Sequence, residues 1–217
     1  MFNISTKYSQ NSDFKAILVN KGSNLSSLRS LIDQKSANEL KNKASKNKRG
    51  FTFISQINNS KFKNFYFFNI NEKMIDHEYQ DLGGLIVSEA LSLKKDKIEI
   101  LFDTLPKQIK NNKSIIQNIL IGVLSKNYSF SNYKQKDQPQ KIVNINLVYA
   151  NKSFVKQALK YAESINLGVT ETRNLVTTPP NILNPVNFVN QVKKLKKFGL
   201  KIEILDEAKL KKIGMNA

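Results

Sequence analysis

The residue types that most often carry out chemistry are scarce in this sequence. There is one histidine, His77, and no cysteine among 217 residues, so thiolate nucleophiles, thiolate metal sites and disulfide bonds are excluded. Asp76 and Glu78 flank the histidine, but adjacent residues of a helix point to different sides, so the three form no chelating face. The sequence contains no His-Glu-x-x-His, no Gly-x-Ser-x-Gly and no glycine-rich phosphate loop. We interpret His77 as a surface or helix-start residue.

The aspartate and glutamate residues do not indicate a metal-binding or catalytic site either. Hydrolysis assisted by metal ions needs several carboxylates, or carboxylates with histidine, around the cations. Glu203 and the pair Asp206-Glu207 are interpreted as a strand edge and a helix cap. From the residues we therefore predict no catalytic, cofactor-binding or metal-ligating residue in this chain.

The formal net charge of the chain is +18. A basic surface attracts nucleic acid because binding releases counterions from the phosphates. The cations are nearly all lysine, with only Arg29, Arg49 and Arg173, whereas phosphate and base recognition favours the planar arginine fork. The lysines are spread along the whole chain and include a basic run at residues 41–50. We interpret them as a solvated surface, and nucleic-acid binding stays open as the alternative.

The composition also predicts whether the chain folds around a core and in which cellular compartment it occurs. Hydrophobic residues make up 40% of the chain, which is enough for a core. No apolar run approaches the roughly 18 residues that span a bilayer, and residues 1–14 contain no apolar region of a signal peptide. The absence of cysteine fits a reducing compartment. We expect a soluble, cytoplasmic protein.

The alternation of strand-like and helix-like segments predicts an α/β fold. Segments rich in β-branched and aromatic residues predict strands over 14–19, 51–57, 65–70, 98–102 and 142–149. Apolar residues at helical spacing predict helices over 25–44, 77–93 and 114–124. Gly83 and Gly84 lie inside the second of these helices, where glycine costs about 1 kcal/mol relative to alanine. We expect them to permit a close approach of this helix to the sheet.

Aromatic residues and lysine alternate along residues 128–134. Such a pattern occurs where the bases of single-stranded nucleic acid stack on protein rings. Our interpretation is instead a loop that packs its rings onto the core of the domain.

The last third of the chain predicts a connecting helix and the opening of a second unit. A helix begins near Phe154, and Gly168 stands where a left-handed residue would end it. Pro179-Pro180 keep the following connector out of helical geometry. Asn184-Pro185 then predict the N-cap and first residue of a second helix. The remaining expected features are a helix end at Gly199, a strand over Leu200–Leu205 and a short helix capped by Asp206.

This last third resembles the domain junction of the leucyl aminopeptidases, peptidase family M17. The family pattern is a linker helix, Gly-Val-Asn-x-Ala-Arg-Asp-Leu-Val-Asn-x-Pro-Ala-Asn-x-Leu-x-Pro, a helix, and Leu-Gly-Met-Gly-Ala. The matching segments here are Gly168-Val169-Thr170, Arg173-Asn174-Leu175-Val176-Thr177, Pro179-Pro180-Asn181, Leu183-Asn184-Pro185 and Ile213-Gly214-Met215-Asn216-Ala217. The departures from the pattern are Thr170, Asn174, Thr177, Pro180 and Asn216. The ordered series across about fifty residues is more specific than any one of its parts.

The resemblance implies a domain organisation. Residues 1–150 would form a macro-domain-like N-terminal module with a mixed sheet flanked by helices. Residues 151–169 would be the linker helix, and residues 170–217 the incomplete start of the α/β catalytic domain.

The resemblance also implies an activity for the full-length relative. Leucyl aminopeptidases are cytosolic exopeptidases that release N-terminal amino acids from peptides by using two divalent ions, manganese or zinc, and a homohexamer is expected. The metal ligands and catalytic residues of the family lie downstream of the Gly-Met-Gly-Ala segment, so none can be assigned to a position here. Arg173 matches a junction arginine and is interpreted as structural, pairing at the domain interface.

The chain of 217 residues is itself expected to be inactive and to bind no metal, as an N-terminal portion of such an enzyme. The alternative is a stand-alone basic binding module, for nucleic acid or a nucleotide-like ligand, without catalysis.

Overall fold

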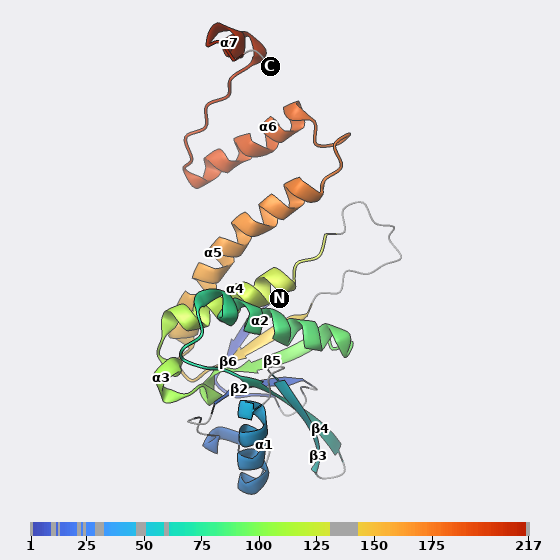
Figure 1. The fold of residues 1–217 in the computed structure, drawn as a ribbon, viewed down its shortest axis with the longest axis vertical. Coiled ribbons are helices and arrows are strands. Elements are labelled where there is room, and N and C mark those ends of the chain that lie inside the picture. The colour runs from blue at the N-terminus through green and yellow to red at the C-terminus, as the bar shows by residue number, and fades with distance from the viewer. Residues whose placement is uncertain are drawn as a thin grey trace. The chain divides into compact units, whose positions relative to one another are not determined.

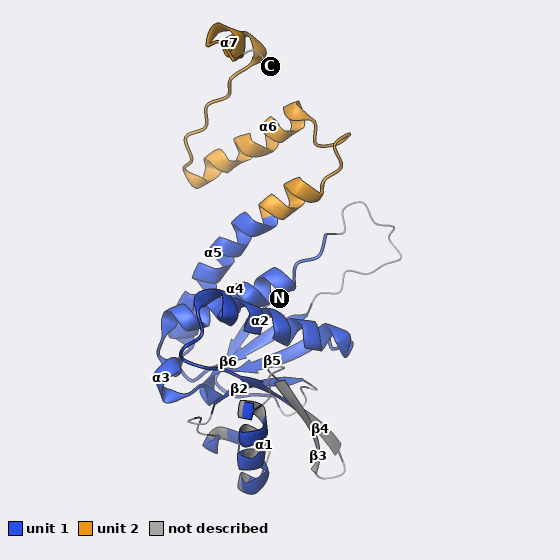
Figure 2. Cartoon of the chain, viewed as in Figure 1, with its two compact units in different colours: residues 1–170 blue, residues 171–217 orange. Residues whose placement is uncertain are grey.

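The computed structural model describes residues 2–9, 12, 14–20, 23, 25–28, 33–46, 51–58, 61–130 and 143–215. The chain divides into two compact units, residues 1–170 and residues 171–217 (Figure 2). The division falls inside one helix, α5 (Lys152–Thr177).

A mixed sheet of six described strands is the centre of the first unit (Figure 1). In spatial order the strands are β1 (Phe2–Ser5), β6 (Asn144–Val148), β5 (Lys97–Leu101), β2 (Lys15–Val19), β4 (Lys61–Asn69) and β3 (Phe51–Asn58). Neighbouring strands from β1 to β4 run parallel, and β3 is antiparallel to β4. The predicted α/β fold is confirmed. Sequence analysis missed β1, because alternation over four residues is too short to stand out.

The larger core lies on one face of the sheet. Strand side chains such as Ala16 and Leu18 point to this face, where they meet helices α2 (Asp76–Ser92) and α4 (Lys113–Lys126). The first half of α5 joins the same core through Val155, Ala158, Leu159 and Ala162.

A smaller core lies on the opposite face. Ile17 and Val19 of β2 pack there with Leu25 and Leu28. The elements on this face are the 3-10 turn η1 (Ser26–Leu28) and helix α1 (Gln34–Lys46) (Figure 1). The helix expected over 25–44 is therefore two separate elements, and residues 29–32 between them lie outside the described part of the chain.

Two glycines bring the backbones of α2 and α4 together. A Cβ atom added at Gly83 would lie 2.0 Å from the carbonyl oxygen of Ile119, and one added at Gly122 would lie 1.8 Å from that of Gln80. The expected close approach at Gly83 is thus an approach to helix α4, and the prediction of an approach to the sheet was wrong. The physical reason is that α2 and α4 lie side by side on one face of the sheet, so each also packs against the other.

The second unit contains short helices, and its helix starts follow the predicted capping. Helix α6 (Pro185–Lys193) begins after Asn184, whose Oδ1 accepts a hydrogen bond from the Asn187 N–H at 2.9 Å. Helix α7 (Glu207–Lys212) begins after Asp206, whose carboxylate accepts from the Lys209 N–H at 2.9 Å. A 3-10 turn, η3 (Lys194–Phe198), ends at Gly199, which has a φ of 85°.

Two predictions for the C-terminal third were wrong. Helix α5 continues through Gly168 to Thr177, and Gly168 is not left-handed, so it does not end the helix. Residues Leu200–Leu205 form no strand in the described structure. A strand is stabilised by a neighbour with which it exchanges hydrogen bonds, and no described strand pairs with this segment.

Among the described residues, no helix is both long enough and apolar enough to cross a membrane.

Candidate functional site

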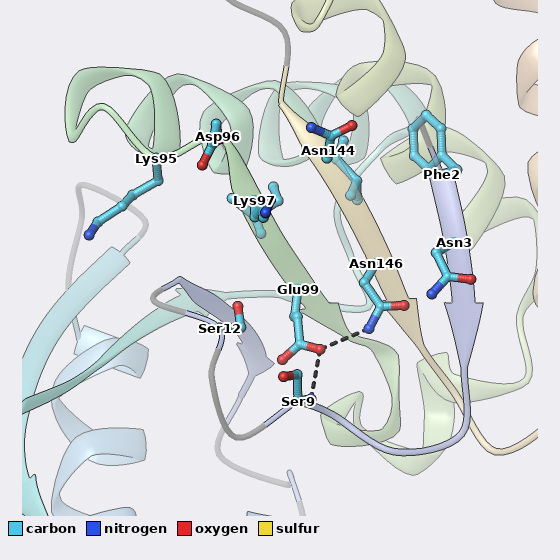
Figure 3. Close-up of a pocket in the computed structure, with 12 residues that line it drawn as sticks. Phe2, Asn3, Ser9, Ser12, Lys95, Asp96, Lys97, Glu99, Asn144 and Asn146 are labelled. Atoms are coloured by element: carbon cyan, nitrogen blue, oxygen red, sulfur yellow. Dashed lines mark hydrogen bonds between the residues drawn. The ribbon is translucent and has the colours of Figure 1, made fainter. Parts of the chain in front are cut away.

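A cavity of about 840 Å³ opens at the amino ends of strands β5 and β6 (Figure 3). Its lining comes from β1, from the segment that follows β1, and from the start of β5 and β6; the residues used below are Ser9, Ser12, Glu99 and Asn146. Ligands of open α/β sheets usually bind at the carboxyl ends of the strands. This cavity therefore lies at the opposite end from the one that the fold alone would suggest.

A row of polar side chains crosses four adjacent strands at the floor of the cavity. The pairing register places Lys15 of β2 opposite Glu99 of β5, Glu99 opposite Asn146 of β6, and Asn146 opposite Asn3 of β1. Residues opposite one another in adjacent strands point to the same face of a sheet, so these four side chains lie side by side. Lys15 and Glu99 are 1% and 3% exposed, which is unusual for charged groups.

The carboxylate of Glu99 holds this row together through one of its oxygens. Oε1 accepts hydrogen bonds from the Ser9 N–H and from Asn146 Nδ2, both at 2.8 Å (Figure 3). Asn146 Nδ2 also donates to Ser5 Oγ at 3.0 Å. Lys15 Nζ donates to the Ser12 carbonyl at 2.6 Å and lies 3.9 Å from Glu99 Oε2.

The carboxyl ends of the same strands carry a second polar cluster. Lys110, at the end of helix α3 (Lys107–Lys110), pairs with Asp103 at 3.0 Å and lies over the ring of Tyr149, 5.3 Å from its centre. The Tyr149 hydroxyl donates to the Lys110 carbonyl at 2.9 Å. Burial raises the pKa of Tyr149, and the nearby Asp103 charge raises it further. Because these groups satisfy one another, we interpret the cluster as structural.

The residues singled out from the sequence are not among the described residues that line the cavity. His77 is exposed in the first turn of α2, and the neighbouring Glu78 carboxylate accepts from the Ile75 N–H at 2.8 Å. Arg173 is exposed on α5. Glu203 is exposed, and Asp206 is the cap already described. Of the aromatic stretch 128–134, residues 131–134 lie outside the described part of the chain.

The described residues do not supply a metal site. They contain no group of three or more His, Cys, Asp or Glu side chains that could hold a metal ion. The described residues therefore do not fit the two divalent ions of leucyl aminopeptidases.

Sequence reasoning missed Lys15, Glu99 and Asn146. A signal was present, because Lys15 and Glu99 each interrupt an otherwise apolar predicted strand. Only the strand order, which puts β2, β5 and β6 next to one another, shows that the three side chains meet.

Comparison with curated proteins identifies relatives of the chain. No protein-family model matches it. The probable cytosol aminopeptidase of Phytoplasma mali is 35% identical over 147 residues, covering 65% of this chain, and that of Agrobacterium fabrum is 34% identical over 150 residues, covering 67%. The chain is a relative of the leucyl, or cytosol, aminopeptidases. The resemblance predicted from the junction motifs is thereby confirmed.

The fold of the chain agrees with this relationship. A solved mutant of tomato leucine aminopeptidase superposes with a TM-score of 0.72 over 98% of this chain, at 13% identity. The chain spans only part of its relatives, namely 29% of the length of each of the two cytosol aminopeptidases and 45% of the tomato chain.

Proposed function

We propose that this chain contributes to an aminopeptidase that releases N-terminal amino acids from peptides. The observation that supports the proposal is the 35% identity to a cytosol aminopeptidase over 147 residues. Identity at this level over 147 residues indicates common descent, and the ordered junction motifs at Gly168–Asn181 and Leu183–Pro185 belong to the same family pattern.

The metal ions, the assembly, the compartment and the substrate of the complete enzyme are proposed from the same family relationship. We propose that the complete enzyme uses two divalent ions, manganese or zinc, that it assembles as a homohexamer, and that it acts in the cytoplasm on peptide substrates. Its metal ligands would come from residues other than those described here.

We further propose how the chain is divided. Residues 1–150 would be a macro-like module, residues 151–169 a linker helix, and residues 170–217 the start of the catalytic domain. A mixed sheet with helices on both faces supports the first assignment, and the division of the two units inside the single helix α5, at residue 170, supports the second.

The reading frame beyond the codon for Ala217 is the first test. A frame that continues into Lys, Asp and Glu ligands and an Asn-Thr-Asp-Ala-Glu-Gly-Arg-Leu segment would allow the complete protein to be assayed. That protein should hydrolyse leucine p-nitroanilide with Mn²⁺ or Zn²⁺, lose activity with a chelator and regain it when the metal returns. A complete protein that folds and stays inactive with either metal would contradict the proposal.

A further inference from the structure

Two buried charges at the floor of the cavity bind a segment of backbone rather than one another. Lys15 Nζ donates to the Ser12 carbonyl at 2.6 Å, and Glu99 Oε1 accepts from the Ser9 N–H at 2.8 Å. The two charged groups themselves are 3.9 Å apart, which is beyond hydrogen-bonding distance. Lys15 and Glu99 belong to strands β2 and β5, whereas the two serines lie in the connection between β1 and β2 and line the cavity. Charged side chains therefore attach this connection to the sheet.

The stability of the sheet does not explain this pair. On the same face, the carboxyl halves of the strands carry apolar side chains, as at Ile17 and Leu101. Burying an ammonium and a carboxylate removes both from water, and replacing such a pair by apolar residues is often neutral or stabilising. Lys15 and Glu99 bear this cost in full, since they are 1% and 3% exposed. A role in positioning the attached backbone accounts for charges at these two places.

Apolar side chains anchor the connection on either side of the two serines. Tyr8 packs against the smaller core. Phe14 is fully buried, and its ring stacks on that of Tyr66 with 4.0 Å between the centroids. The backbone at Ser9 and Ser12 can therefore move while the anchors on both sides of it stay in place.

The two charges have a second arrangement available. Glu99 Oε2 is shielded from solvent and accepts no hydrogen bond in the described structure. Lys15 Nζ forms an ion pair with this oxygen at 3.9 Å, and a shift of about 1 Å would bring the two atoms to the distance of a charged hydrogen bond. If the backbone at the two serines moves away, the ammonium and the carboxylate can pair directly. Neither charge is then left buried without a partner, which is the most costly arrangement.

We propose that Lys15 and Glu99 are a latch with two positions at the edge of the cavity. In the closed position, which the structure shows, Glu99 binds the backbone of Ser9 and Lys15 binds that of Ser12; Figure 3 draws the first of these bonds. In the released position, the two charged groups pair with one another, the backbone at the two serines bonds to water, and the cavity widens where the serines line it. The release is a local opening that leaves the sheet folded.

Native-state hydrogen exchange of the wild-type chain, followed by NMR, tests whether the opening is local. The Ser9 amide should exchange about 100-fold or more faster than the amides of Ile17 and Ile100 in the sheet. Its rate should depend little on low concentrations of urea, because a local opening exposes little surface, whereas the sheet amides should follow global unfolding. A Ser9 amide that exchanges together with the sheet amides, or as fast as in an unfolded chain, would overturn the proposal.

A double variant separates the latch from a role in global stability. Lys15→Met with Glu99→Met removes both charges at similar side-chain volume, so the urea midpoint of unfolding should stay the same or rise. Exchange at Ser9 should accelerate by about 10-fold or more, because the charged acceptor is lost. Unchanged exchange would show that the charges do not bind the backbone in this way. A fall in global stability equal to the loss of protection at Ser9 would show that the pair supports the core instead.

The two single variants test the direct pairing in the released position. Each of them deprives the remaining charge of its partner in that position, so Lys15→Met and Glu99→Met should each accelerate exchange at Ser9 less than the latch contact they remove would suggest. The double variant should therefore accelerate exchange by more than the product of the two single effects. A double effect equal to that product would contradict the direct pairing.

The ion pair of Lys110 and Asp103, 3.0 Å apart near the carboxyl ends of the strands, provides the matched control. Lys110→Gln with Asp103→Asn also removes one charge of each sign, and it should leave exchange at Ser9 unchanged. Acceleration at Ser9 in this control would show a general weakening of the sheet and contradict the assignment to Lys15 and Glu99. Because the exchange experiment on the wild type needs no variant, it tests the local opening even if the double variant does not fold.

Discussion

Gly83 and Gly122 set how closely helices α2 and α4 approach. A Cβ atom at either position would lie within 2.0 Å of a backbone carbonyl oxygen, a distance at which the backbone must shift. We expect Gly83→Ala and Gly122→Ala each to lower the free energy of unfolding by about 3 kcal/mol or more, at the upper end of overpacking effects. Urea denaturation followed by circular dichroism measures the change.

Gly84 is the matched control for this prediction. A Cβ atom there would meet its nearest neighbours at 3.9 Å, which is ordinary van der Waals contact. Since alanine favours a helix interior over glycine by about 1 kcal/mol, Gly84→Ala should leave stability unchanged or raise it slightly. If Gly83→Ala proved as stable as Gly84→Ala, the close approach of the helices would be contradicted.

Two buried tyrosines predict a loss of stability in alkali. Burial raises the pKa of Tyr79 and Tyr149 above the ordinary value of 10.0, with Asp76 and Asp103 respectively adding to the effect. Their hydroxyl groups donate to the carbonyls of Asn71 and Lys110. The unfolded chain ionises first, so this contribution is complete below pH 10 and is lost as the pH rises through the raised folded pKa values.

Urea denaturation between pH 8 and pH 11 tests this contribution. Above about pH 10, the free energy of unfolding of the wild type should fall more steeply than that of Tyr149→Phe, because the variant lacks one of the two phenols. Parallel declines would show that Tyr149 does not contribute.

At the residue level, the sequence predicted the caps but not the site. Asn184 and Asp206 act within three residues of their own position, so local spacing was sufficient to find them. Glu99 meets Asn146 and the Ser9 N–H, from segments far apart in the sequence. Such contacts depend on strand order, which periodicity does not determine.

Helix α5 contains a glycine that can be exchanged to strengthen it. A Cβ atom added at Gly168, inside the helix, would have no neighbour within 4 Å, whereas Gly199 has a φ of 85° at the end of η3. We expect Gly168→Ala to raise stability by up to about 1 kcal/mol. Gly199→Ala, in a left-handed position, should lower it by about 1 kcal/mol. Thermal melts of the two variants check the opposite signs, and a destabilising Gly168→Ala would show that the helix ends there after all.

At the level of elements, strands and helices were predicted well where their pattern was long. Helix α4 and strand β2 appear close to their predicted bounds because each carries a continuous apolar pattern. The prediction failed where a local pattern lacked support from the rest of the fold. Leu200–Leu205 alternates like a strand but has no described strand to pair with. Gly168 follows an apolar helical pattern as a helix end would, but helix α5 continues through it to Thr177.

At the scale of the whole molecule, the net charge of +18 predicts non-specific attraction to polyanions. The charge is carried by lysines spread along the chain, and the arginine among the described residues, Arg173, belongs to α5, whereas α1 carries lysines alone as its basic residues. Lysine is a point charge that neutralises phosphate without reading bases, so affinity should follow charge and not sequence. We expect duplexes of unrelated sequence to bind equally, and polyglutamate to compete with them.

Fluorescence anisotropy at increasing salt tests this interpretation against that of a nucleic-acid-binding module. Counterion release makes purely electrostatic binding fall steeply, by about 10³-fold or more between 50 and 200 mM salt if six or more phosphates are contacted. Binding should therefore disappear near physiological salt for every duplex alike. A preference among sequences that persists at 200 mM salt would instead require base contacts, and it would make nucleic-acid recognition a function of this chain rather than a consequence of its charge.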